Sequence, residues 1–262
     1  EQFTRALELD ETYAPAHAAL ADCYNQFGTV LVGTGSPREY RPRAAAEAIK
    51  ALQLDPNSAE AHAALASVLA HMRFRLADRS VPFDDARDAS LRALELAPGL
   101  AVAHVARAQV LASDGQVPEA AAAFEHAIML DARLFDAHYY YARHCYTQGH
   151  YARAVDLFVA AHRVQPDEFQ ALMLAVNCAD AAGDEERKKK LAIEALACAS
   201  HQAQIDPENA RAHYMAAGLM RHLGVGDGGV EQMAYALRIR PNDFDVLYNG
   251  ACYYALGNEA ER

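Results

Sequence analysis

The chain has 262 residues and a formal net charge of -11 at pH 7, and 52% of its residues are hydrophobic, with no Trp. This charge repels a phosphate backbone and the chain has no long apolar run, so neither a nucleic acid nor a membrane is an expected partner. The five cysteines lack CxxC spacing, and we expect small buried thiols in a reducing, cytoplasmic compartment.

In chain order, residues 1–13 have the spacing of a second helix of a helical hairpin, with Phe3 and Ala6 on one face. Six repeats of a helix-turn-helix unit follow, and five of their boundaries carry a proline: Pro56, Pro98, Pro166, Pro207 and Pro241. The repeats span residues 14–58, 59–100, 101–134, 135–168, 169–209 and 210–243, and residues 244–262 begin a seventh. This recurrence predicts one all-α solenoid over residues 1–262, with a half unit at each end.

Within a repeat, glycine and small residues indicate where each helix ends and how the helices pack. Gly115, Gly149 and Gly224 follow the first helices, at points where the chain needs a positive φ. The second helices carry small residues around a phenylalanine, as in Ala120, Phe124 and Ala127 and again in Ala154, Phe158 and Ala161. Such residues let paired helices approach closely.

Three repeats have 34 residues, and the repeats end near proline, so the chain resembles the tetratricopeptide repeat (TPR) family. The resemblance covers nearly the whole chain and implies a right-handed α-α superhelix. Histidine stands at the family's usual Trp position of the first helix, at His17, His62, His104, His138 and His213. These histidines lie too far apart to share one metal ion, so we expect each imidazole to bond a neighbouring backbone group.

Three repeats exceed 34 residues. Residues 28–42 and 76–84 contain Gly, Pro or Ser and predict long loops. The segment Glu185–Ile205 contains neither Gly nor Pro, and its seven extra residues equal about two helical turns, which predicts an elongated second helix.

The segment from Val246 to Gly257 resembles the last repeats of bacterial multidomain regulators, where such an array follows a class III nucleotide cyclase, a protein kinase or a winged-helix domain. This resemblance implies a regulatory signalling segment cut from a longer protein. Apolar surface left at the two half units would favour a homo-oligomer.

In the TPR architecture the first helices line a concave face. Repeats one to three place there Asp22, Asn25, Gln26, Glu60, Ser67, His71, Val102, Val105 and Gln109, and repeat four adds Asp136. The C-terminal repeats are richer in Tyr and Arg, which often anchor binding. We therefore expect a peptide, with acidic groups for the arginines, to contact Tyr139, Arg143, Tyr146, Asn177, Arg211, Tyr214 and Arg221. The alternative is that these residues only cover a solvated or packed helix face.

Two further motifs have simpler interpretations. The places of the carboxylate clamp that TPR proteins use for chaperone tails hold Ala18 and Asp22, which disfavours that ligand. The glycine-rich run Gly224–Gly229 follows a helix and lacks Lys-Ser/Thr, so it predicts a turn and not a phosphate loop. Because no catalytic or metal-binding set can be assembled, the sequence predicts a non-catalytic interaction scaffold without a cofactor. The alternative is the regulatory or self-association segment described above.

Overall fold

The computed structural model describes residues 2–27, 37–75 and 83–259. Throughout these ranges the secondary structure is helical, with fourteen helices and no strand. The all-α fold class predicted from the sequence is confirmed.

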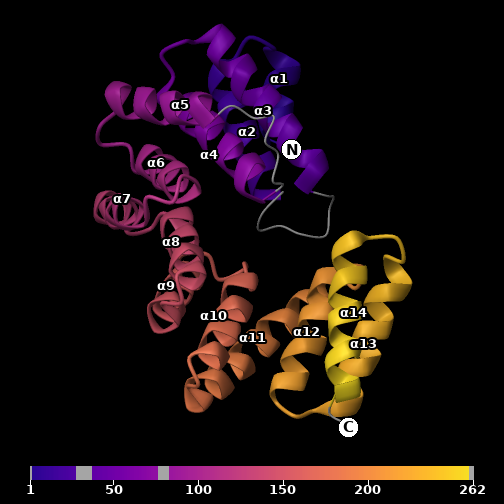
Figure 1. Cartoon of the computed structure of the whole chain (residues 1–262). Coiled ribbons are helices and arrows are strands. Elements are labelled where there is room, and N and C mark those ends of the chain that lie inside the picture. Colours follow the sequence, from indigo (N-terminus) through magenta and orange to yellow (C-terminus); the bar gives the residue numbers. More distant parts are fainter. Residues whose placement is uncertain (1, 28–36, 76–82, 260–262) are drawn as a thin grey trace. The chain divides into compact units, whose positions relative to one another are not determined.

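Most helices pair as consecutive hairpins (Figure 1). Their bounds are α1 Gln2–Leu9, α2 Ala14–Phe27, α3 Pro37–Leu54, α4 Ala59–Arg75, α5 Phe83–Leu96, α6 Ala101–Ser113, α7 Val117–Leu130, α8 Phe135–Thr147, α9 Tyr151–Val164, α10 Gln170–Ala181, α11 Glu185–Ile205, α12 Ala210–His222, α13 Gly226–Ile239 and α14 Phe244–Glu259.

The helices group into two compact bodies, whose boundary in the chain falls within α8 after His144. In the N-terminal body α2 pairs with α3, α4 with α5 and α6 with α7, and the first helices α2, α4 and α6 adjoin in that order. In the C-terminal body α10 contacts α9 and α11, and α12 contacts α11, α13 and α14. The single domain over residues 1–262 stays a prediction.

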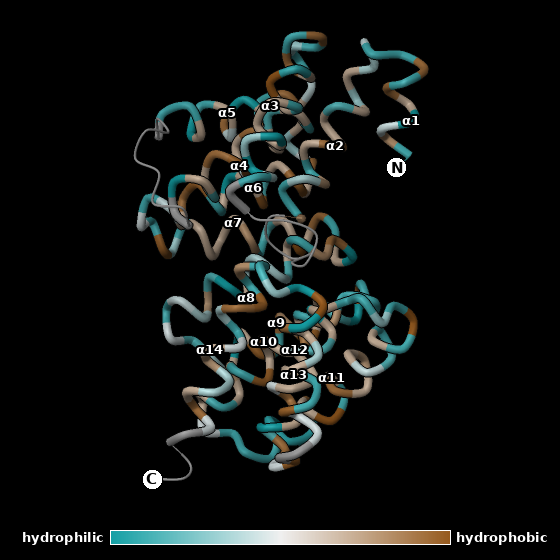
Figure 2. Tube along the Cα trace, turned by 90° about the vertical axis from the view of Figure 1, so that its right-hand side faces the viewer, coloured by the Kyte–Doolittle hydropathy of each residue, from teal (hydrophilic) through white to brown (hydrophobic). Residues whose placement is uncertain are grey.

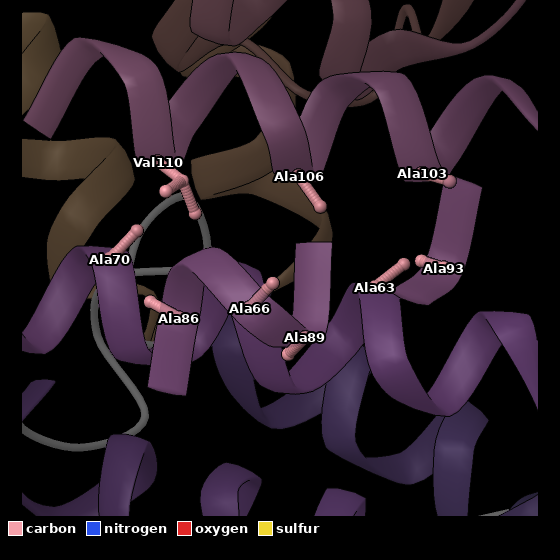
Figure 3. Close-up of a cluster of buried hydrophobic side chains, with 9 residues drawn as sticks. All are labelled: Ala63, Ala66, Ala70, Ala86, Ala89, Ala93, Ala103, Ala106 and Val110. Atoms are coloured by element: carbon pink, nitrogen blue, oxygen red, sulfur yellow. The ribbon is translucent and has the colours of Figure 1, made fainter. Parts of the chain in front are cut away.

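Alanine forms much of the core. One cluster of buried side chains joins α4, α5 and α6 in the N-terminal body (Figure 3). Its members are Ala63, Ala66, Ala70, Ala86, Ala89, Ala93, Ala103, Ala106 and Val110. Small side chains on three facing helices allow close backbone approach, and that approach gives the repeat its helix spacing.

The turns within the repeats use glycine as predicted. Gly115, Gly149 and Gly224 have φ values of 77°, 76° and 72°, and Gly183 follows the same pattern with 71°. A side chain in this left-handed region is strained, so the turn selects glycine. The turn predicted over Gly224–Gly229 is confined to Gly224 and Val225, because α13 begins at Gly226, so the prediction is wrong for the rest of this run.

The predicted elongated helix is also confirmed. Helix α11 spans Glu185–Ile205 and has 21 residues, whereas α9 and α13 have 14 each. Its N-cap is Asp184, whose Oδ1 accepts a hydrogen bond of 3.0 Å from the backbone N–H of Arg187. The seven extra residues extend the helix by about two turns without rotating its buried face.

The predicted loops are partly wrong. Residues 28–36 and 76–82 lie outside the described residues, but 37–42 belong to α3 and 83–84 to α5. Helix α3 continues through Pro42 because its first turns are fixed by packing. Tyr40 stacks on Tyr24 at 6.0 Å between ring centroids, and the buried Arg41 donates from Nη1 to the carbonyl oxygen of His71 at 3.1 Å.

The recurrent histidines form one repeated hydrogen bond, as predicted. In each case Nε2–H donates to the backbone carbonyl six residues earlier, at distances of 2.7–3.1 Å. The five donors are His17, His62, His104, His138 and His213. Each bond ties a first helix to the turn that precedes it, which is why a polar ring can occupy the place where the TPR family usually has Trp.

Two expectations about composition are also tested. Cys145 and Cys178 are buried as expected, and Cys23 and Cys198 are half-buried. Cys252 is exposed on α14, so the prediction of a buried thiol is wrong there. Polar residues are interspersed with apolar ones along the helices (Figure 2), and no described helix is long and apolar enough to cross a membrane.

Candidate functional site

A concave pocket of about 480 Å³ lies in the N-terminal body. Helices α2, α4, α6 and α8 line it, together with the turn before α4. Its polar lining includes Asp22, Asn25, Glu60, Ser67, Gln109 and Asp136. The sequence assigned all six to the concave face of the expected superhelix.

The pocket is acidic. Asp22 comes from α2, Glu60 from α4 and Asp136 from α8, and Asp55 lines the pocket from the turn before α4. Among the described lining residues there is no Lys, Arg or His. Three of the four first helices that line the pocket, together with the turn, therefore contribute carboxyl groups to its lining.

Two of these carboxyl groups are poorly solvated. Gln26 Nε2 donates to Asp22 Oδ2 at 3.1 Å, whereas the buried Oδ1 of Asp136 has no hydrogen-bond partner in the described part of the chain. Burial raises the pKa of Asp22 to about 6. Burial, and next the negative charge of Asp22, raise the pKa of Asp136 to about 8, although a hydrogen bond from Gln26 lowers it. Near neutral pH the pair therefore carries less than its full negative charge.

Gln109 on α6 adds a second kind of unsatisfied group. Its side chain is 7% exposed and lines the pocket, and neither Oε1 nor Nε2 has a hydrogen-bond partner among the described residues. A buried amide left unpaired costs about 1–3 kcal/mol for each group. It matches a ligand that offers both a donor and an acceptor.

One wall of the pocket is held by contacts behind it. His71 Nδ1 donates to Asn25 Oδ1 at 3.1 Å, and the His71 ring lies 5.1 Å from the ring of Tyr140, centroid to centroid. Arg41 in turn donates to the His71 carbonyl oxygen. These contacts fix Asn25 and Tyr140, both of which line the pocket, so this wall is preorganised.

The site residues selected from the sequence lie elsewhere. On α8, Tyr139 is fully buried and stacks on Phe135 at 5.2 Å between centroids. The guanidinium carbon of Arg143 lies 5.7 Å from the centroid of the Tyr139 ring. Tyr146, beyond the boundary between the bodies, is exposed and lies 5.7 Å from the ring of Tyr151.

In the C-terminal body the selected arginines already have partners. Arg211 is 5% exposed, and its Nη2 lies 2.5 Å from Oε1 of Glu168, itself 2% exposed. The guanidinium carbon of Arg221 lies 3.6 Å from the centroid of the Tyr253 ring. Tyr214 is buried, which raises the pKa of its hydroxyl, and Asn177 is half-buried on α10. These arginines thus make internal contacts that a ligand would have to replace.

Sequence reasoning placed the pocket residues on the concave face but did not select them. Tyr and Arg were considered the best binding residues, so the C-terminal repeats were chosen as the site. Gln109 was passed over because the other concave-face residues of its repeat, Val102 and Val105, are apolar. The available signal was the recurrence of Asp22, Glu60 and Asp136 at concave places of three repeats. Their convergence on one pocket, and the absence of a cation in its described lining, required the structure.

No protein-family model matches the chain, and no curated protein matches it. Among solved structures, PilW, described as a widely conserved type IV pilus biogenesis factor, is 17% identical, with 90% of this chain and 97% of that chain covered at a TM-score of 0.56. Pseudomonas aeruginosa PilF is 18% identical, with 90% and 98% covered and a TM-score of 0.53.

A human IFIT1 dimer with m7Gppp-AAAA is 19% identical, with 85% of this chain and 55% of that chain covered and a TM-score of 0.57. The chain thus spans about half the length of IFIT1. At these identities the likeness shows the fold alone. The chain has the fold of tetratricopeptide repeat arrays, as its repeats predicted.

Proposed function

We propose that the chain is a non-catalytic interaction scaffold that binds a peptide or protein segment on its concave face. The observation that carries this proposal is the pocket built by the first helices of four consecutive repeats. Its volume of about 480 Å³ lies within the range of about 300–1,000 Å³ that is usual for ligand pockets. A groove along stacked helices suits an elongated ligand, because each repeat contributes similar positions in turn.

The residues selected from the sequence are an alternative set of candidates for contact with a ligand. Tyr146 is exposed and Asn177 is half-buried, so neither needs a large rearrangement to meet a ligand. Arg211 would have to leave Glu168, and that exchange is unfavourable because it strands a buried carboxylate. We therefore propose the pocket of the N-terminal body as the principal site.

A substitution that fills the pocket tests this function. Peptides selected from a displayed random library on the full chain should lose binding when Ser67, which lines the pocket, is changed to Trp. The matched control is Met129→Trp on α7, since Met129 is 74% exposed and does not line the pocket. Circular dichroism checks that both variants fold. Selected peptides that bind the Ser67→Trp variant as well as the unchanged chain would refute concave-face binding.

A second candidate function is self-association, as in a segment of a larger bacterial signalling protein. It is favoured by α14, where Phe244 and Tyr248 are 72% and 60% exposed and stack at 6.2 Å between centroids. Sedimentation velocity tests it: a concentration-dependent dimer should disappear in the Phe244→Ser, Tyr248→Ser double variant. A monomer at all concentrations would exclude this function.

A further inference from the structure

We propose that the concave pocket binds a Lys or Arg side chain of an extended partner segment, whose peptide backbone pairs with Gln109. This inference rests on the proposed function and adds the chemical class of the ligand. It reverses the expectation from the sequence, which assigned acidic groups to the partner.

Charge complementarity favours a cationic ligand. Carboxyl groups of Asp22, Glu60 and Asp136 enter one pocket from three helices, and its described lining contains no basic residue. The Asp136 Oδ1 atom is buried and unpaired within the described ranges. An ammonium or guanidinium group would supply the missing donor and the missing positive charge together. An anionic ligand would add a further like charge, which disfavours it.

The amide of Gln109 favours a peptide ligand, independently of charge. Gln109 presents a buried amide, with both a donor and an acceptor unpaired within the described chain, to the same pocket. A peptide group carries one N–H and one C=O, so it can satisfy Nε2 and Oε1 of Gln109 at once. A free polyamine carries donors only and would leave the Gln109 Nε2–H group unpaired. The amide therefore favours a peptide over a small amine.

Coordination of a bare metal ion is a less suitable use of these carboxyl groups. The described residues contain no group of three His, Cys, Asp or Glu side chains placed to hold an ion. A longer cation that reaches separate carboxyl groups fits the arrangement better. The titratable groups that line the pocket are Asp22, Asp55, Glu60, Asp136 and Tyr140. The ring of His71 lies 5.1 Å from that of Tyr140, so His71 also faces the site.

Fluorescence anisotropy with the full chain tests the proposal. The probe is a labelled octapeptide of alternating Lys and Ala, and its counterpart carries Glu in place of Lys. We expect the Lys peptide to bind and the Glu peptide not to bind. Asp22→Asn and Asp136→Asn should each lower the affinity for the Lys peptide by about ten-fold, which corresponds to the loss of one charge-assisted contact. Gln109→Leu should lower the affinity for the Lys peptide but leave the affinity for spermidine unchanged.

The matched control is Asp167→Asn, which removes the same charge from an exposed turn outside the pocket. An equal loss of affinity in this variant would show that only overall charge matters and would overturn the proposal. Spermidine that binds as tightly as the peptide, with Gln109→Leu affecting neither, would assign the site to free amines instead.

The two proposals can fail separately. The library-selected peptides could lose binding to the Ser67→Trp variant although they lack basic residues and bind the Asp22→Asn and Asp136→Asn variants with unchanged affinity. In that case the assignment of a cationic ligand is wrong, while binding on the concave face stands. If Ser67→Trp has no effect on any peptide, the proposed function is wrong as well. Circular dichroism of each variant separates a loss of binding from a loss of fold.

Discussion

Replacing Asp136 by Asn should make the protein less sensitive to alkaline pH. Burial and the charge of Asp22 raise the pKa of Asp136 from 3.8 to about 8. When the pH lies between these two pKa values, Asp136 is protonated in the folded state and ionised in the unfolded state. The free energy of unfolding therefore falls as pH rises through this window. Asn removes the titration, and no hydrogen bond to the buried Oδ1 is lost within the described chain.

The magnitude follows from the interval between pH 6 and pH 8. The unfolded carboxyl is fully ionised throughout this interval, while the folded carboxyl gains its charge only near the upper end. One pH unit corresponds to about 1.4 kcal/mol, so the titration of Asp136 can lower the free energy of unfolding by at most about 2.7 kcal/mol over two units. Relaxation around the charged group reduces this, and we expect about 1–2 kcal/mol.

Urea unfolding at pH 6, 7 and 8, followed by circular dichroism, measures the effect. The difference in stability between Asp136→Asn and the unchanged chain should grow with pH. Only the pH dependence of this stability difference is compared, so any pH-independent effect of the substitution on stability cancels. The exposed control Asp167→Asn should run parallel to the unchanged chain. Parallel curves for Asp136→Asn as well would refute the assignment of a buried, proton-holding carboxyl group.

Three further predictions follow from other features. Gly149→Ala should lower the free energy of unfolding by about 1–2 kcal/mol, because φ is 76° there, whereas Gly99→Ala, at a glycine without positive φ, should not; equal effects on urea unfolding would contradict this. Arg211→Met should cost about 3 kcal/mol by stranding the buried Glu168, and adding Glu168→Gln should restore part of it; a double variant no more stable than the single one would argue against the ion pair. Binding of the Lys octapeptide should tighten from pH 6 to pH 8 as the pocket carboxyls ionise, with proton release measurable by calorimetry in two buffers; affinity independent of pH would contradict that coupling.

The repeat architecture could be predicted because its determinants are local. Glycine is required where φ is positive, as at Gly115, and the run without Gly or Pro before Ile205 allowed α11 to extend to its full 21 residues. The histidine bonds could be predicted for the same reason, since His104 reaches a carbonyl only six residues away in the chain. The loop predicted around Pro42 is part of α3, because the buried packing of Arg41 outweighs the local helix-breaking effect of the proline.

The candidate site depended on distant pairs, which no local pattern contains. Arg211 was selected as a ligand-binding residue, but its carboxylate partner Glu168 lies 43 residues earlier, in the connection between α9 and α10. Asp22 lies in the first repeat and Asp136 in the fourth, yet the charge of Asp22 raises the pKa of Asp136. The sequence alone assigned the pocket residues to one face of the first helices, because the positions within a repeat are set by local helical periodicity. Only the tertiary structure decided which side chains already have hydrogen-bond or ion-pair partners and which can bind a ligand, because burial and pairing depend on neighbours from other helices.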